Sequence, residues 1–258
     1  METKESILQR VFGYSAFRGG QEALIDAQLS GRDAFGIMPT GGGKSLCYQI
    51  PALLLDGVTL VISPLISLMR DQVMALKNAG VAAAYINSSL TPNQIRLVYR
   101  NIRTGMYKII YVAPERLLTD GFLEAIQTRK VSLVTVDEAH CISQWGQDFR
   151  PSYLKIVDFL NIVQPRPVVS AFTATATELV RQDIAEILKL RDPLRIVTGF
   201  DRPNLRFEVQ KPAQKLPALL ELVRQRRDKA GIIYCATRKA VEEVCRNLQL
   251  NDIAATRY

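Results

Sequence analysis

The fold of this chain is most constrained by a regular alternation of short β-rich runs with stretches of helical length. The β-rich runs are residues 34–38, 59–63, 83–87, 109–113, 133–137 and 168–173. They are almost continuously apolar, as strands of a parallel sheet are when helices cover both faces. Between them apolar residues recur at helical spacing, for example at Ile66, Met69, Val73 and Leu76. The pattern predicts an α/β fold with a doubly wound, mostly parallel sheet, which binds ligands outside the carboxyl ends of its strands.

The alternation breaks near residues 199–204, where Pro203 removes a backbone donor and restricts the residue before it. We therefore expect a first lobe over residues 1–199, a connector over residues 200–210 and the beginning of a second lobe over residues 211–258.

Within the second part the pattern predicts helices at residues 215–227 and 239–251, and strands at residues 231–235 and 253–258. A sheet cannot end well after so few elements. The sequence therefore predicts that the second lobe is truncated at Tyr258.

Composition excludes several classes of protein. The net charge is +8, and six of these charges lie in residues 151–258, which favours a polyanionic partner only weakly. Residues 1–10 mix charges without an apolar run, and no segment is apolar enough to span a bilayer, so we expect no membrane association. The four cysteines form no C-x-x-C pair, which predicts free thiols in a reducing, cytoplasmic compartment and no zinc site.

A glycine-rich loop between a predicted strand and a predicted helix is the strongest motif. Its residues are Met38, Pro39, Thr40, Gly41, Gly42, Gly43, Lys44 and Ser45. Glycines let backbone N–H groups converge on phosphate oxygens, and the helix amino terminus adds partial positive charge. Lys44 would neutralise the β- and γ-phosphates of ATP, and Ser45 would coordinate Mg²⁺. Met38 stands where the general pattern has glycine.

Two adjacent acids, Asp137 and Glu138, follow the predicted strand 133–137 at the ligand-binding edge of the sheet. Asp137 can hold Mg²⁺ through water, and Glu138 can orient or deprotonate the attacking water. His140, the only histidine, is expected to relay the nucleotide state to a neighbouring loop. A metal site at His140 is not expected, because no second His or Cys follows at metal spacing and Cys141 is adjacent in sequence.

These two motifs together resemble a superfamily 2 helicase, and the residues after His140 resemble the aromatic-rich loop of RecQ helicases. In that loop Gln144, Trp145, Phe149 and Arg150 are expected to couple ATP hydrolysis to nucleic acid, since aromatic rings and arginine can stack on bases. Core packing of Trp145 and Phe149 is the alternative.

Other segments resemble the same family in the same order. Residues 12–21 look like its adenine-recognition segment, in which Tyr14 or Arg18 can stack on the ring and Gln21 can pair with its edge. Residues 200–204 and 232–235 match the start of its second lobe. The segments that resemble strand-contacting or coupling motifs contribute Ser63, Arg70, Gln72, Glu115, Arg116, Thr173 and Thr175.

The resemblance implies a RecA-like phosphate-loop lobe and an activity: ATP- and Mg²⁺-dependent 3′→5′ unwinding of DNA in recombination and repair. It implies single-stranded 3′ tails and duplex junctions as DNA partners, and a nucleoid-associated location. The family's arginine finger, zinc-binding and winged-helix segments would lie beyond Tyr258, so the chain alone is expected to bind ATP and DNA but unwind poorly. Two alternatives stay open: a related RNA helicase, and a non-enzymatic nucleotide- and DNA-binding fragment.

Overall fold

A seven-stranded parallel sheet forms the centre of the first part of the chain. The computed structural model describes residues 2–199 and 205–257 and divides into two units, Met1–Asp201 and Arg202–Tyr258. The sheet belongs to the first unit and has the order β3-β4-β2-β5-β6-β1-β7, with every adjacent pair parallel. Its strands are β1 (Ala34–Ile37), β2 (Val58–Ile62), β3 (Ala83–Ile86), β4 (Ile109–Val112), β5 (Val131–Val136), β6 (Val168–Thr173) and β7 (Leu194–Val197).

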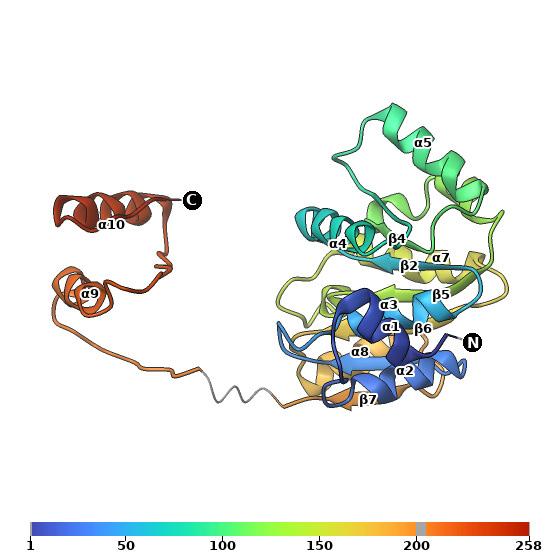
Figure 1. The fold of residues 1–258 in the computed structure, drawn as a ribbon, viewed down its shortest axis with the longest axis horizontal. Coiled ribbons are helices and arrows are strands. Elements are labelled where there is room, and N and C mark those ends of the chain that lie inside the picture. The colour runs from blue at the N-terminus through green and yellow to red at the C-terminus, as the bar shows by residue number, and fades with distance from the viewer. Residues whose placement is uncertain (1, 200–204, 258) are drawn as a thin grey trace. The chain divides into compact units, whose positions relative to one another are not determined.

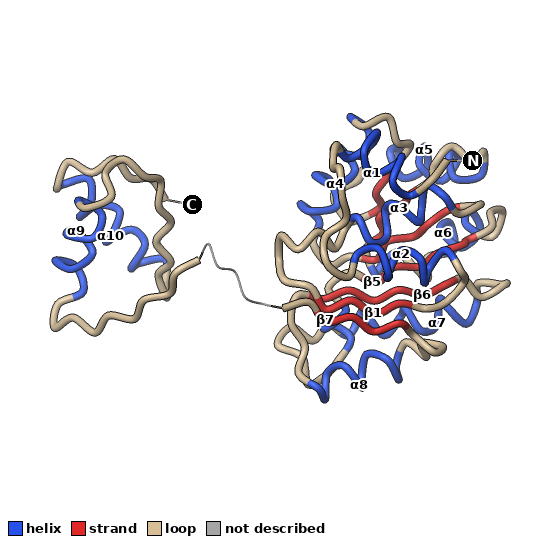
Figure 2. Tube along the Cα trace, turned by 60° about the horizontal axis from the view of Figure 1, so that its bottom comes forward, coloured by secondary structure: helices blue, strands red, loops and turns tan. Residues whose placement is uncertain are grey.

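Helices cover both faces of this sheet (Figures 1 and 2). On one face lie α1 (Lys4–Phe12), α2 (Gln21–Leu29), α3 (Leu46–Leu54) and α4 (Ile66–Asn78). On the other lie α5 (Pro92–Arg103), α6 (Asp120–Ile126), α7 (Lys155–Ile162) and α8 (Glu178–Ile187). Successive side chains of a strand point to opposite faces of the sheet: Leu60 packs in the core beneath α5 to α8, and Val61 packs in the core beneath α2 to α4. The predicted doubly wound α/β class is thereby confirmed.

The six predicted strands are all present, and five of them end one residue earlier than predicted. The helix predicted from the 66–76 pattern is α4, in which Met69, Val73 and Leu76 are buried and Ile66, at the first turn, is 41% exposed. The seventh strand, β7, was not predicted. It lies at the sheet edge and its residues alternate between half-buried and exposed, so it lacks the continuous apolar run of a central strand.

In the second unit the described residues 205–257 form two helices, α9 (Lys215–Arg224) and α10 (Arg238–Leu250), and no strand. Both predicted helices are confirmed: α9 ends three residues earlier than predicted, and α10 is shifted by one residue toward the amino terminus. The strands predicted at residues 231–235 and 253–258 are wrong for the described positions: Ile232 is 82% exposed and Tyr234 is 91% exposed. A strand needs neighbours, and this part of the described chain supplies none. Residues 200–204 of the predicted connector, and Tyr258, lie outside the described residues.

Three short 3-10 turns complete the first unit: η1 (Pro114–Arg116), η2 (Ala139–Ile142) and η3 (Pro151–Leu154). Across the described residues, each helix is too short or too polar to cross a lipid bilayer.

Candidate functional site

The motifs singled out in the sequence meet at the carboxyl edge of the sheet. In the order β2-β5-β6-β1, the segments that follow β5 and β1 are the acid pair and the glycine-rich loop. Two backbone bonds join neighbours there: Met38 N donates to the Thr173 carbonyl at 3.0 Å, and Asp137 N donates to the Ile62 carbonyl at 2.8 Å. Strand pairing therefore brings together residues that are far apart in the sequence, 135 positions in the case of Met38 and Thr173.

The glycine-rich loop bends through backbone conformations that favour glycine. Gly41 and Gly43 have φ angles of 79° and 78°. A Cβ on Gly43 would also lie 2.2 Å from the amide nitrogen of Gln21, so the loop could not close in this way with a larger residue. Ser45 caps α3, whose amino terminus carries partial positive charge toward the loop. This arrangement suits a bound phosphate.

Gln21 ties the predicted adenine segment to the glycine-rich loop. The side chain is 1% exposed, and its Nε2 donates to the carbonyls of Gly42 at 3.3 Å and Gly43 at 3.1 Å. Its Oε1 accepts from Arg18 N at 2.8 Å, and Arg18 Nη1 donates to the Gly41 carbonyl at 3.5 Å. The amide is thus engaged within the chain, and adenine pairing by Gln21 remains a prediction. Tyr14 is 48% exposed beside this segment.

Asp137 is a buried carboxylate at the carboxyl end of β5. Burial, and to a lesser degree the neighbouring Glu138 carboxylate, together raise its pKa from 3.8 to about 6 against the opposing effect of Lys44. Among the described residues no Lys or Arg forms an ion pair with it. A buried acid of this kind is stabilised by a cation, and the oxygen ligands of Asp137 and Ser45 suit Mg²⁺. The residues present therefore fit the metal that the motif implies.

Glu138 lies between the glycine-rich loop and His140. Its Oε1 is 3.6 Å from Lys44 Nζ, and its Oε2 is 3.4 Å from His140 Nδ1. The backbone of Glu138 is left-handed, with φ of 48°, which is strained for a residue with a side chain and recurs at functional sites. The two carboxylate oxygens of Glu138 thus face Lys44 and His140.

His140 connects this acid motif to the end of β6. Its Nδ1 lies 2.9 Å from Thr173 Oγ1, and the Thr173 hydroxyl donates to the Thr175 carbonyl at 3.1 Å. Because a hydroxyl has one proton, Thr173 accepts from His140, and Nδ1 carries the ring proton. The other ring nitrogen, Nε2, then presents a lone pair toward Cys141.

The loop that follows is exposed at its tip and fixed at its base. Trp145 is 70% exposed, which rules out the core-packing alternative for this residue, whereas Phe149 is half-buried. Arg150 N donates to the Cys141 carbonyl at 2.9 Å and closes the loop. A Cβ on Gly146 would lie 2.4 Å from the His140 carbonyl, so the turn depends on glycine at that position.

The remaining predicted nucleic-acid residues are placed unevenly. Arg70, Glu115, Gln144 and Thr175 are exposed, and Arg116 is half-buried. Ser63 is 1% exposed and its hydroxyl has no hydrogen-bond partner, so its side chain does not reach the surface. A coupling role for Ser63 stays a prediction, and with a buried hydroxyl it would act through neighbouring residues.

Sequence reasoning missed a buried amide network beneath the site. Gln49, from α3, donates to Gln72 Oε1 at 2.9 Å and to the Tyr111 hydroxyl at 2.8 Å. It joins the helix after the glycine-rich loop to α4, where Gln72 was predicted to contact nucleic acid. The sequence singled out Gln72 but not its link to Gln49 and Tyr111, because the three residues come from different elements.

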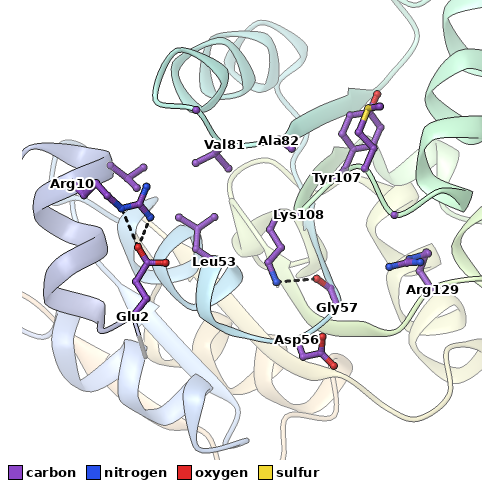
Figure 3. A pocket seen from close by; sticks show the side chains of 14 residues that line it. Glu2, Arg10, Leu53, Asp56, Gly57, Val81, Ala82, Tyr107, Lys108 and Arg129 are labelled. Carbon is purple, nitrogen blue, oxygen red and sulfur yellow. Dashed lines mark hydrogen bonds and ion pairs between the residues drawn. The ribbon is translucent and has the colours of Figure 1, made fainter.

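A cavity of about 370 Å³ lies elsewhere, at the amino ends of the strands (Figure 3). The cavity is lined by residues that immediately precede three strands: Gly57 before β2, Ala82 before β3 and Lys108 before β4. Arg10 of α1 also lines it. Lys108 Nζ donates to the Leu55 carbonyl at 2.5 Å there. The cavity contains none of the predicted site residues, so the candidate site is the opposite edge.

The known proteins to which this chain is similar are helicases. Residues 18–183 match the DEAD/DEAH box helicase family. The chain is 47% identical over 255 residues to the ATP-dependent DNA helicase RecQ of Bacillus subtilis (strain 168), covering 98% of this chain and 43% of that protein. It is 45% identical to RecQ of Haemophilus influenzae, covering 99% and 41%, and 39% identical to the ATP-dependent DNA helicase Q1 of Pongo abelii, covering 98% and 41%.

Solved structures share the fold at low identity. The DUF1998 helicase MrfA bound to DNA and AMPPNP has a TM-score of 0.74 at 15% identity, covering 97% of this chain and 38% of that chain. A hypothetical ATP-dependent RNA helicase from Sulfolobus tokodaii has a TM-score of 0.59 at 20% identity, covering 95% and 72%.

The chain spans less than half the length of the three relatives described above. The family match covers well over half of this chain and includes both the glycine-rich loop and the acid motif. The chain therefore belongs to the DEAD/DEAH box helicase family, and within it is a relative of the RecQ DNA helicases.

Proposed function

We propose that this chain forms the first motor lobe, residues 1–199, and the beginning of the second lobe, residues 211–258, of a RecQ-type ATP-dependent DNA helicase. The observation that carries the proposal is the continuous set of contacts from Lys44 through Glu138 and His140 to Thr173. It links the glycine-rich loop to a motif that resembles the strand-coupling motif of that family.

In this proposal the ATP site consists of the glycine-rich loop and the acid motif. Lys44 balances charge on the β- and γ-phosphates, and Asp137 and Ser45 hold Mg²⁺. The ion, when bound, neutralises charge that develops on the phosphoryl oxygens. Glu138, which lies 3.6 Å from Lys44, orients or deprotonates the attacking water.

Coupling to DNA follows from what surrounds His140. A change at Glu138 when the γ-phosphate leaves would alter its contact with His140 Nδ1, and His140 is bonded to Thr173 on one side and adjoins the Cys141 end of the loop on the other. The exposed Trp145 at the tip of that loop can stack on an unpaired base. Nucleotide state would thereby reach the DNA-binding surface through contacts of 2.9 to 3.7 Å.

DNA is favoured over RNA as the substrate because the relatives that align along nearly the whole chain are named as DNA helicases. Single-stranded 3′ tails and duplex junctions, 3′→5′ polarity, nucleoid association and roles in recombination and repair extend the proposal by family resemblance.

Steady-state ATP hydrolysis with and without single-stranded oligonucleotides tests the proposal. We expect single-stranded DNA to raise the turnover rate and RNA of the same sequence to raise it far less, with Lys44→Ala as the background. Equal or stronger stimulation by RNA would favour an RNA helicase. ATP binding with no turnover above the Lys44→Ala background would favour a non-enzymatic nucleotide- and DNA-binding protein.

A further inference from the structure

Three side chains of metal-ligating type gather at the base of the aromatic loop. They are His140 and Cys141 in η2 and Asp148 seven residues further along the chain. Cys141 Sγ lies 3.7 Å from His140 Nε2 and 3.8 Å from Asp148 Oδ2, and the three ligand atoms all lie within 4.8 Å of one another. The loop brings its two ends together through the bond from Arg150 N to the Cys141 carbonyl.

These separations match those between ligands of a tetrahedral zinc ion. With Zn–S of about 2.3 Å and Zn–N of about 2.0 Å, a tetrahedral angle places the sulfur and the nitrogen about 3.5 Å apart. Nitrogen, sulfur and carboxylate oxygen are the three donor types that zinc takes in proteins. The existing side-chain positions would therefore need little adjustment to accept an ion.

The histidine is already in the form that a metal requires. Because Nδ1 donates to Thr173 Oγ1 at 2.9 Å, the unprotonated Nε2 points its lone pair at Cys141. A bond from the second ring nitrogen to a protein oxygen is the usual way in which a ligating histidine is oriented. Thr173 would thus support the site without touching the ion.

Access is available from one side. Asp148 is exposed and His140 is half-buried, whereas Cys141 is buried, so an ion would approach from the Asp148 side and keep water as its fourth ligand. Binding would replace the thiol proton of Cys141, which would pass to solvent. In the metal-free chain, burial and the Asp148 carboxylate raise the pKa of that thiol to about 12.

Contrary to the expectation from the sequence, we infer that His140, Cys141 and Asp148 form a binding site for Zn²⁺ or a similar thiophilic divalent cation, which would lock the base of the aromatic loop. Asp148 Oδ2 now accepts from Arg150 Nη2 at 2.8 Å and from Nε at 3.1 Å, so a metal at this oxygen would also displace Arg150. The consequence for DNA coupling rests on the proposed function, whereas the metal site does not.

Cobalt provides a direct test, because a Co²⁺ ion bound by a thiolate gives a near-ultraviolet charge-transfer band. Metal-free chain titrated with Co²⁺ is expected to show this band at one ion per chain, together with quenching of Trp145, the only tryptophan. Zn²⁺ should displace the cobalt, while Mg²⁺ should not, since it prefers oxygen ligands. Absence of the band at saturating Co²⁺ would overturn the site.

Variants assign the ligands. Cys141→Ser should abolish the band. Asp148→Asn should weaken cobalt binding more than about tenfold. Because Asp148 is exposed, this second variant provides a test even if Cys141→Ser fails to fold. Cys235→Ser, in the second unit, is the matched control and should bind cobalt as the unmodified chain does. A band that survives Cys141→Ser, is lost in Cys235→Ser, or is unaffected by Asp148→Asn would refute the assignment. None of these readouts requires ATP hydrolysis, so they fail independently of the helicase proposal.

Discussion

The Nδ1 nitrogen of His140 lies 2.9 Å from the hydroxyl oxygen of Thr173, and this bond joins the segment after β5 to the end of β6. Thr173 is fully buried, and its hydroxyl also donates to the Thr175 carbonyl. The threonine therefore accepts from the acid motif and donates to the segment that follows β6, so it can transmit a change at one to the other.

Replacing this hydroxyl with a methyl group, as in Thr173→Val, is expected to uncouple the two segments. ATP affinity should change little, because the hydroxyl of Thr173 bonds to His140 and to the Thr175 carbonyl, but stimulation of ATP hydrolysis by single-stranded DNA should be largely lost. The unpaired partners should lower the free energy of unfolding by about 1–3 kcal/mol. Turnover assays and chemical denaturation measure both effects.

Thr128→Val is the matched control for that variant. Its hydroxyl donates to the Ala125 carbonyl at 2.8 Å after α6, at the opposite edge of the sheet. We expect it to keep full DNA stimulation. Equal loss of stimulation in both variants would indicate a general loss of stability rather than a coupling role for Thr173.

Lys44→Ala should reduce ATP hydrolysis to background and weaken ATP binding, because the γ-phosphate loses its main cation. Titration with a fluorescent ATP analogue and a phosphate-release assay measure the two effects. Lys77→Ala, an exposed lysine of α4, is the control and should behave as the unmodified protein does. Turnover that persists in Lys44→Ala would remove the glycine-rich loop from the ATP site.

Glu138→Gln should differ in kind from Lys44→Ala. The amide keeps the shape of the side chain and leaves Asp137 to hold Mg²⁺, so ATP should still bind. Without the base, turnover should fall by about 10²–10⁴-fold. Binding and turnover measured on the same preparation separate the two roles, and a collapse of ATP affinity in Glu138→Gln would contradict the division of labour between the adjacent acids.

Much of this architecture is predictable from sequence because it depends on local patterns. Central strands such as β2 are continuous apolar runs, and the glycine-rich loop needs glycine at positions with positive φ. The edge strand β7 was missed because one of its faces meets solvent. The strand predicted at residues 231–235 failed for the opposite reason: its apolar run is present, but no neighbouring strand pairs with it in the described second unit.

The site is predictable to a lesser degree, because residue types do not reveal their partners. Gln21 was assigned to adenine, yet both ends of its amide bond to the chain. Asp148 carries no signal of its own, and only the closed loop places it beside Cys141. Similarly, the buried Asp33 accepts from both terminal nitrogens of Arg166, at 3.1 and 2.7 Å, in a pair that spans 133 positions.

The raised pKa of Asp137 predicts a pH-dependent stability. In the metal-free protein the unfolded chain ionises near pH 3.8 and the folded chain near pH 6, so the free energy of unfolding should fall as pH rises across this interval and level off above it. Asp137→Asn removes this penalty and should raise stability at pH 7 by up to about 3 kcal/mol, at about 1.4 kcal/mol per pKa unit.

Denaturation at pH 3.5 and pH 7, without Mg²⁺, measures that difference. Asp56→Asn, at a side chain 93% exposed, is the control and should show little change at either pH. Saturating Mg²⁺ with nucleotide should reverse the ranking at pH 7, because only the carboxylate gains from the cation. A variant less stable than the unmodified protein without metal would show that the ionised Asp137 is stabilised by its surroundings.

Trp145→Ala tests whether the exposed aromatic ring contacts DNA. An indole that is 70% exposed contributes little to the core, so the change in the free energy of unfolding should stay within about 0.5 kcal/mol. A buried tryptophan or phenylalanine would instead lose about 3–5 kcal/mol on truncation to alanine. Loss of one stacked base should weaken binding of single-stranded DNA by about 1–3 kcal/mol, which is roughly 5- to 150-fold. Fluorescence anisotropy with a labelled oligonucleotide, at fixed salt, measures the affinity, and thermal melting measures the stability.

Phe149→Ala provides an internal comparison, because removing this half-buried ring should destabilise the protein more than removing the Trp145 ring does. If Trp145→Ala melted early and bound DNA normally, the ring would be a packing residue and the aromatic loop would not be the contact with the strand.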